Sequence, residues 1–91
     1  AARNFYTVHR EFPGGKGFAD LVFIPRKKFS EKPALVVELK WDKTARGAIT
    51  QIKEKEYCRS LEEYHGNLLL VGINYDRKTR EHTCCIEEME R

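Results

Sequence analysis

"PALVVELKW", residues 33–41, is the stretch of this sequence that decides the fold. Most of its residues are aliphatic, which predicts a strand that enters a hydrophobic core. Glu38 and Lys40 interrupt the run two positions apart, and a strand directs such side chains to the same face. A carboxylate in a buried strand requires compensation, because an unpaired buried charge is costly.

The segments around this strand predict the other elements. Aromatic and β-branched residues predict strands at residues 4–12 and 18–25, joined by the glycine-rich turn "PGGKG" as an antiparallel hairpin. After the strand at residues 34–41, Asp42 or Thr44 caps a helix that continues to about Glu63, with Gly66 as its C-cap. "LLLVGINY" (residues 68–75) predicts a strand buried on both faces, and "EHTCCIEEM" (residues 81–89) a final edge strand.

The predicted order is therefore β-β-β-α-β-β, an α/β fold with a mixed sheet and one main helix. The strand–helix–strand unit in its middle implies a parallel, right-handed crossover. The 91 residues are enough for a single domain, which we expect to span residues 1–91.

Composition excludes several classes of protein. At 41% hydrophobic and 34% charged residues the chain is globular, and no apolar run approaches the length of a membrane span. The net charge of +3 suits an anionic partner without establishing one. Three cysteines without ligand spacing, and no signal peptide, favour reduced thiols in a cytoplasmic setting. The three histidines are best explained as solvated or structural residues.

Asp20 is a second acid within an apolar strand, residues 18–25. If the two strands are neighbours, Asp20 and Glu38 repel each other, and Lys40 compensates only in part. A divalent cation held by oxygen ligands would remove this repulsion, and Mg²⁺ prefers such ligands. The alternative is a solvated ion pair between Glu38 and Lys40, with Asp20 as a turn residue.

The order of these motifs resembles the PD-(D/E)xK nuclease superfamily. "GKGFAD" supplies its first acid, "VVELK" its (D/E)-x-K motif, and "AITQI" the helix motif whose glutamine faces the site. More closely, "GGKGFADLVFIP", "PALVVELKWDKTARGAITQIKEKEY" and "LLLVGINYDRKTREHTCCIE" together resemble the PD-(D/E)xK domain found at the C-terminus of bacterial AAA-ATPase-like proteins. The resemblance implies a restriction-endonuclease-like core. The helix that usually precedes the first strand of that core is missing, so a partner or a further segment is expected to cover part of the sheet.

The resemblance also implies a set of site residues. Asp20, Glu38 and the backbone carbonyl of Leu39 hold Mg²⁺, for which Mn²⁺ substitutes. Lys40 orients or deprotonates the attacking water, and Gln51 positions Lys40 or the phosphate.

Several other charged residues are weaker candidates. Lys16, Lys43 and Arg46 are candidates for contacts with flanking phosphates, although each suits an ordinary solvated charge equally well. Glu11 is a candidate auxiliary acid, or simply a charge at the end of a strand.

The function implied is that of a Mg²⁺-dependent DNA endonuclease in repair, recombination or defence. Recognition of DNA structure is expected rather than of sequence, because no segment is typical of a base-reading helix. An uncovered apolar sheet face or the "CCIEEM" edge would support a homodimer. Two alternatives remain: a catalytically idle nucleic-acid-binding or assembly module of a larger ATPase-containing protein, and a protein-interaction scaffold.

Overall fold

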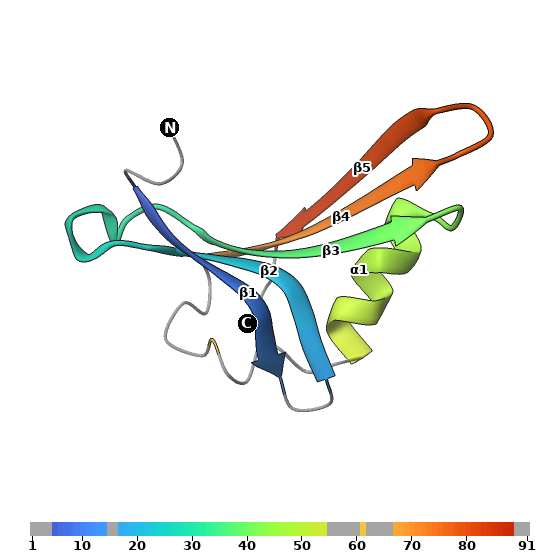
Figure 1. Ribbon diagram of the computed structural model, residues 1–91. Coiled ribbons are helices and arrows are strands. Elements are labelled where there is room, and N and C mark those ends of the chain that lie inside the picture. Colours follow the sequence, from blue (N-terminus) through green and yellow to red (C-terminus); the bar gives the residue numbers. More distant parts are fainter. Residues whose placement is uncertain (1–4, 15–16, 55–60, 62–66, 89–91) are drawn as a thin grey trace.

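The computed structural model describes residues 5–14, 17–54, 61 and 67–88 (Figure 1). They form the strands β1 (Tyr6–Gly14), β2 (Gly17–Pro25), β3 (Ala34–Trp41), β4 (Leu68–Asp76) and β5 (Glu81–Glu88), the helix α1 (Ala45–Glu54) and a short 3-10 helix, η2 (Lys27–Phe29). The predicted α/β fold with a mixed sheet and one main helix is confirmed. The predicted extension of the helix to Glu63 and the C-cap at Gly66 lie outside the described residues.

The five strands lie in the sheet in their chain order, β1-β2-β3-β4-β5. β1 and β2 form the predicted antiparallel hairpin, and β5 is antiparallel to β4 at the edge of the sheet. β3 and β4 are parallel along the whole of β3, from Ala34 opposite Leu68 to Trp41 opposite Tyr75. This pairing along its full length supports β3 on one side.

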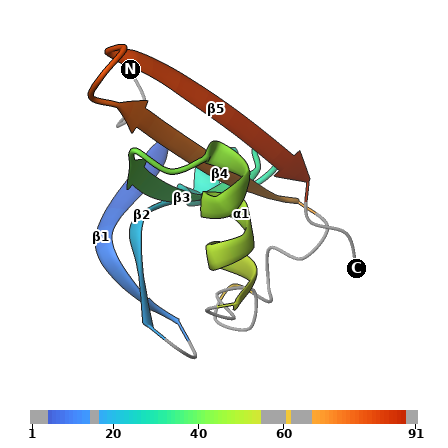
Figure 2. The same ribbon diagram turned by 90° about the vertical axis from the view of Figure 1, so that its right-hand side faces the viewer.

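β2 and β3 are paired over a much shorter stretch. Their antiparallel ladder runs only from Phe23 opposite Leu35 to Leu21 opposite Val37. Beyond it, β1 and β2 bend towards the side of the sheet on which α1 lies (Figures 1 and 2). The sheet therefore opens between β2 and β3 at the level of Asp20 and Glu38.

Helix α1 begins directly after Thr44, whose Oγ1 accepts a hydrogen bond from the backbone N–H of Gly47 at 2.9 Å. Thr44 is thus the N-cap, and the alternative cap, Asp42, is not used. Apolar residues at helical spacing bury one face of α1 against the sheet: Ala45, Ala48, Ile49 and Ile52. They pack in a core with residues of β2, β3 and β4, among them Val22, Val36 and Leu70.

Gly72 of β4 lets α1 approach the sheet closely. A Cβ atom at this position would lie 2.2 Å from the carbonyl oxygen of Ala45 and 2.9 Å from the Cβ of Ala48. Since non-bonded atoms do not approach so closely, only glycine fits beneath the first turn of the helix. This contact fixes the height of α1 above β3 and β4.

The two faces of the sheet differ in cover. Along β4, buried positions (Leu68, Leu70, Gly72 and Asn74) alternate with half-buried ones (Leu69, Val71, Ile73 and Tyr75). The prediction that this strand is buried on both faces is therefore wrong. α1 covers one face, and no described helix covers the other, which we call the open face (Figure 2). The helices of the described residues include none that is long and apolar enough to cross a membrane.

Candidate active site

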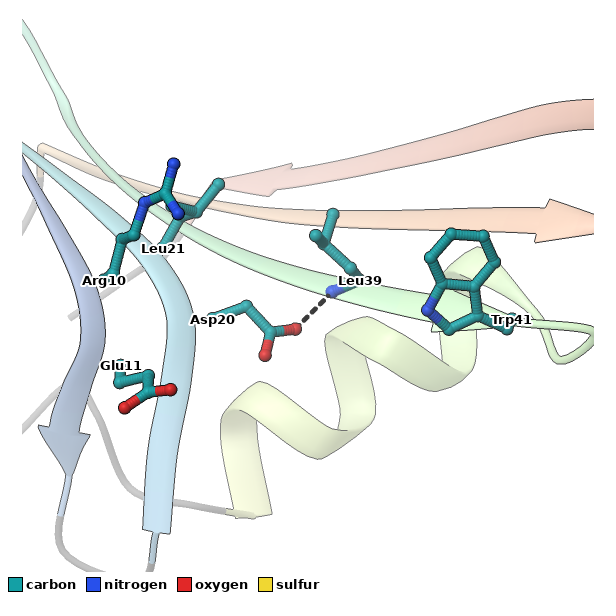
Figure 3. Close-up of a pocket in the computed structure, with 6 residues that line it drawn as sticks. All are labelled: Arg10, Glu11, Asp20, Leu21, Leu39 and Trp41. Carbon is teal, nitrogen blue, oxygen red and sulfur yellow. Dashed lines mark hydrogen bonds between the residues drawn. The ribbon is translucent and has the colours of Figure 1, made fainter.

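Asp20 lies where β2 and β3 separate. Its Oδ2 accepts a hydrogen bond of 2.7 Å from the backbone N–H of Leu39, across the opening between the strands (Figure 3). The last ladder pair before the opening is Leu21 with Val37, so the next positions along the two strands are Asp20 and Glu38. The carboxylate of Asp20 is thereby held against the peptide that links Glu38 to Leu39.

Glu38 is almost fully buried, with 3% of its surface exposed, on the face that α1 covers. The side-chain Nε2 of Gln51, on α1, donates a hydrogen bond of 3.1 Å to Oε1 of Glu38. We expected Gln51 to position Lys40 or a phosphate; in the structure its hydrogen bond goes to Glu38. The contact orients the carboxylate, because a charged acceptor forms the stronger kind of hydrogen bond.

Lys40 is half-buried, two residues beyond Glu38 on β3, and lies opposite Asn74 of β4. Asn74 is buried, and its Oδ1 accepts a hydrogen bond of 2.9 Å from the backbone N–H of Lys43. This bond fixes the chain as it leaves β3 beyond Lys40. Sequence reasoning did not identify Asn74 as a site-supporting residue, although a polar residue inside the run "LLLVGINY" is a signal for one.

A hollow next to Asp20 is lined by Arg10, Glu11, Asp20, Leu21, Leu39 and Trp41 (Figure 3). Glu11, the predicted auxiliary acid, lies between the ladder pairs of Arg10 with Leu21 and Phe12 with Ala19, so it is opposite Asp20. Its φ of 50° is in the left-handed region, which a residue with a side chain adopts at some cost. The structure thus brings Glu11 to the same hollow as Asp20.

The predicted phosphate contacts are only partly described. Lys43 is exposed in the loop between β3 and α1, and Arg46 is exposed on the first turn of α1. Both lie at the end of β3 that carries Lys40. Lys16 lies outside the described residues.

Asp42, which sequence reasoning considered as a helix cap, forms a clasp with the turn between β4 and β5. Its carboxylate accepts hydrogen bonds of 2.8 Å from the backbone N–H and from the side-chain Nε of Arg77. The backbone N–H of Arg77, followed by its side chain, lowers the pKa of Asp42 below its usual value. Asp42 has a φ of 54°, and its own N–H donates to the carbonyl of Tyr75, so the clasp shapes the exit from β3.

The residues around Asp20 offer hard oxygen donors, which suit a divalent cation. The donors are the carboxylate of Asp20, that of Glu38 at the neighbouring register position, and the backbone between them. In the described ranges no cluster of three or more His, Cys, Asp or Glu side chains that could hold a metal is found. Mg²⁺ is compatible with so small a set, because it is commonly bound by one or two carboxylates together with waters and substrate phosphates.

A comparison with protein families gives a match that covers nearly the whole chain. The model of the PD-(D/E)XK nuclease superfamily matches residues 1–84. Nucleases of this superfamily generally use divalent metals. No curated protein and no solved structure gives a significant match.

Proposed function

Because this chain belongs to the PD-(D/E)XK nuclease superfamily, we propose that it is a Mg²⁺-dependent DNA nuclease that hydrolyses phosphodiester bonds with a metal-activated water. The observation that carries the proposal is the hydrogen bond of Asp20 to the N–H of Leu39. It joins the acid of β2 to the (D/E)-x-K motif of β3, two parts of the chain that are 19 positions apart in sequence.

Asp20, Glu38 and the backbone carbonyl of Leu39 are the proposed metal ligands. A bound Mg²⁺, or Mn²⁺ in its place, lowers the pKa of a coordinated water and neutralises charge on the phosphate oxygens. Gln51 holds Glu38 through the hydrogen bond between its Nε2 and Oε1 of Glu38. We assign Gln51 as a positioning residue for Glu38, in place of the role beside Lys40 implied by the resemblance.

Lys40 is the proposed partner of the attacking water. An ammonium group beside the scissile phosphate stabilises the negative charge of the transition state, and a neutral amine can accept the proton of the water. The residue lies on β3 directly after Leu39, and the bond between Asn74 and Lys43 holds the chain behind it. Glu11 is the proposed auxiliary acid, because it lines the hollow that Asp20 lines.

Recognition of DNA structure rather than sequence is the proposed mode of substrate selection. Helix α1 packs one face against the sheet, and no segment of the sequence is typical of a base-reading helix. Lys16, Lys43 and Arg46 are the proposed contacts to flanking phosphates, which supply affinity without reading bases. We further propose that the protein cleaves within a strand, as an endonuclease does, and that it acts in repair, recombination or defence.

A homodimer is the proposed assembly. β5 is an edge strand whose outer side is unpaired by the described strands, and an edge of this kind is a template for pairing with a second copy. Two sites related by symmetry would then be available for two strands of DNA. An ATPase domain in a longer parent protein is the proposed further partner.

The experiment is a cleavage assay on a panel of labelled substrates: duplex, nicked duplex, flap, single strand and four-way junction. Each is incubated with the purified protein in Mg²⁺, Mn²⁺ and EDTA. We expect cleavage in both metals and none in EDTA. Binding of the same substrates without cleavage in any metal would contradict the proposal and favour an idle nucleic-acid-binding module. A protein that neither cleaves nor binds any of these substrates would favour a protein-interaction scaffold.

A further inference from the structure

Three rings from adjacent strands meet on the open face of the sheet: Trp41 of β3, Tyr75 of β4 and His82 of β5. We call them the aromatic cluster. Trp41 is opposite Tyr75, and Tyr75 opposite His82, in the two ladders. The ring centroids of Trp41 and Tyr75 are 5.4 Å apart at an interplanar angle of 81°, and those of Tyr75 and His82 are 4.7 Å apart at 44°.

The aromatic cluster is not part of a described core. Trp41 is 57% exposed, and its neighbour Leu39 is 39% exposed. A large exposed ring carries an unfavourable hydration cost, which a ligand that covers the ring would remove. The cluster is therefore a surface suited to a flat, apolar group.

The surface beside the aromatic cluster is continuous with the hollow at Asp20. Leu39, Lys40, Trp41, Ile73, Tyr75 and His82 line one depression. Leu39 and Trp41 also line the hollow that contains Asp20 (Figure 3). A group that lies against Trp41 is thus a neighbour of whatever occupies the Asp20 hollow.

Positive charge surrounds the same end of the sheet. Within residues 40–46 and 76–82 there are six cationic side chains and three acidic ones: Lys40, Lys43, Arg46, Arg77, Lys78 and Arg80 against Asp42, Asp76 and Glu81. Asp42 is engaged by Arg77. Lys40 shares the face of Glu38 and Arg46 lies on α1, so these two cations flank the cluster from the α1 side of the sheet, whereas Arg77, Lys78 and Arg80 belong to the turn between β4 and β5. Cations near exposed rings suit single-stranded nucleic acids, since the cations contact phosphates and the rings stack on bases.

We propose that the aromatic cluster stacks an unpaired nucleobase of the strand that is cut, so that the substrate class is single-stranded or locally unpaired nucleic acid. The inference rests on the proposed nuclease function and refines its substrate. A paired base hides its faces inside the duplex, whereas an unpaired base offers a flat face to Trp41. Stacking tolerates any base, which agrees with recognition of structure rather than sequence.

A protein partner is the competing occupant of this surface. The aliphatic part of the open face, with Val71 and the exposed Ile86, lacks rings and would suit a protein. The aromatic cluster lies at the other end, beside the turn between β4 and β5 that carries Arg77, Lys78 and Arg80. This separation favours nucleic acid at the cluster.

The test uses the intrinsic fluorescence of the chain's single tryptophan. The protein is titrated in EDTA with a short oligothymidylate, so that binding is measured without cleavage. We expect quenching of Trp41 fluorescence that saturates with oligonucleotide. An abasic oligomer with the same number of phosphates should bind at least roughly tenfold more weakly, since the stacking of one base on a ring changes the affinity by about this factor.

Variants locate the effect. Measured by the anisotropy of a labelled oligothymidylate, Trp41→Ala should weaken binding roughly tenfold, while Trp41→Phe should retain most of it. Ile86→Ala is the matched control: the residue is 62% exposed on the same face, outside the cluster, and its removal should leave binding unchanged. Since both side chains are exposed, neither variant is expected to lose the cooperative thermal unfolding of the wild type.

The result that overturns the inference is equal binding by wild type and Trp41→Ala, or equal binding of the abasic and normal oligomers. A blue shift of Trp41 fluorescence as the protein concentration is raised, without oligonucleotide, would show the ring covered by a second copy and would overturn the inference; a homodimer that leaves the Trp41 emission unchanged agrees with it. Failure of the nuclease proposal is separate, because it would appear as an absence of cleavage in Mg²⁺ while the binding measurements in EDTA remain valid.

Discussion

Gly72 of β4 lies directly opposite Glu38 of β3 in the parallel ladder. The glycine admits the first turn of α1 against the sheet, and the glutamate meets Gln51 from the same helix. Packing of the core and orientation of a proposed metal ligand therefore depend on one close contact between helix and sheet.

Gly72→Ala is expected to displace α1. The added methyl would meet the carbonyl oxygen of Ala45, a backbone atom that moves only with the helix. Overpacking of this kind costs about 1–3 kcal/mol, and we expect the upper part of that range in the free energy of unfolding by urea. Gly47→Ala is the comparison variant: its methyl meets Oγ1 of Thr44, an exposed side chain that can turn away at the expense of its cap hydrogen bond, so a smaller loss of stability is expected. A Gly72→Ala protein as stable as wild type would contradict the packing.

Glu38 and Gln51 are expected to be energetically coupled. In a double-mutant cycle with Glu38→Leu and Gln51→Leu, their shared hydrogen bond should give an interaction of about 1–2 kcal/mol in unfolding free energy, because a charged acceptor is involved. Thr50→Val, the neighbouring exposed position on α1, supplies the control cycle with Glu38→Leu and should be additive. A coupling energy no larger than in the control cycle would refute the assignment of Gln51 as a positioning residue for Glu38.

Glu38→Gln and Lys40→Ala are expected to lower the cleavage rate at least about a hundredfold, the size of effect associated with loss of a single catalytic group. Both should remain folded. Lys28→Ala is a suitable control, because this lysine lies in η2, away from Asp20 and Glu38 in the chain and exposed. Wild-type rates of cleavage in either purified site variant would refute the assignment of that residue.

Much of the fold could be predicted from hydrophobic periodicity and turn residues. The strands, their order along the chain and the Thr44 cap carry local signals. The number of faces of β4 that are buried has no such local signal, because "LLLVGINY" is the same sequence pattern whether one or both faces are buried. Only the two interruptions of this run, Gly72 and Asn74, carry a hint: both lie on the face that α1 covers.

The candidate site was less accessible to sequence reasoning. Glu11, Asp20 and Glu38 can be recognised in the sequence as acids in or beside apolar strands. The contacts that each of them makes with other elements cannot be recognised there. The partner of Gln51 depends on the height and rotation of α1 over the sheet, which Gly72 sets. The engagement of Asp42 by Arg77 joins loops that are 35 positions apart, so the residue's potential as a helix cap was a misleading local signal.

The Asp42–Arg77 clasp is expected to contribute a pH-dependent part of the stability. Hydrogen bonds from Arg77 lower the pKa of Asp42 below 3.8, its value in an unfolded chain. The stabilising contribution is therefore fully present above about pH 5 and is lost as the pH falls through the lowered pKa. Asp42→Asn should remove it, and asparagine tolerates the φ of 54° equally well.

The measurement is urea unfolding of wild type and Asp42→Asn from neutral pH down to about pH 2, through the range in which the carboxylate titrates. We expect a constant difference at the higher pH values that shrinks on acidification. In an Arg77→Ala background the difference should be smaller and less dependent on pH. A difference that grows as the pH falls would have the wrong sign for this clasp.

The order of the strands, identical in the sheet and in the chain, has a consequence for how the protein folds. The pairs β1–β2 and β4–β5 are hairpins, and β3 follows β2 after a short connection, so these pairings close small loops. Only the parallel pairing of β3 with β4 must wait for residues 42–67 to be drawn together. Because closure of a long loop is paid for before its contacts form, this step is expected to limit the rate of folding. The same step brings Gly72 beneath α1, so β3, which carries the proposed metal ligand Glu38, is expected to acquire its support from β4 late in folding.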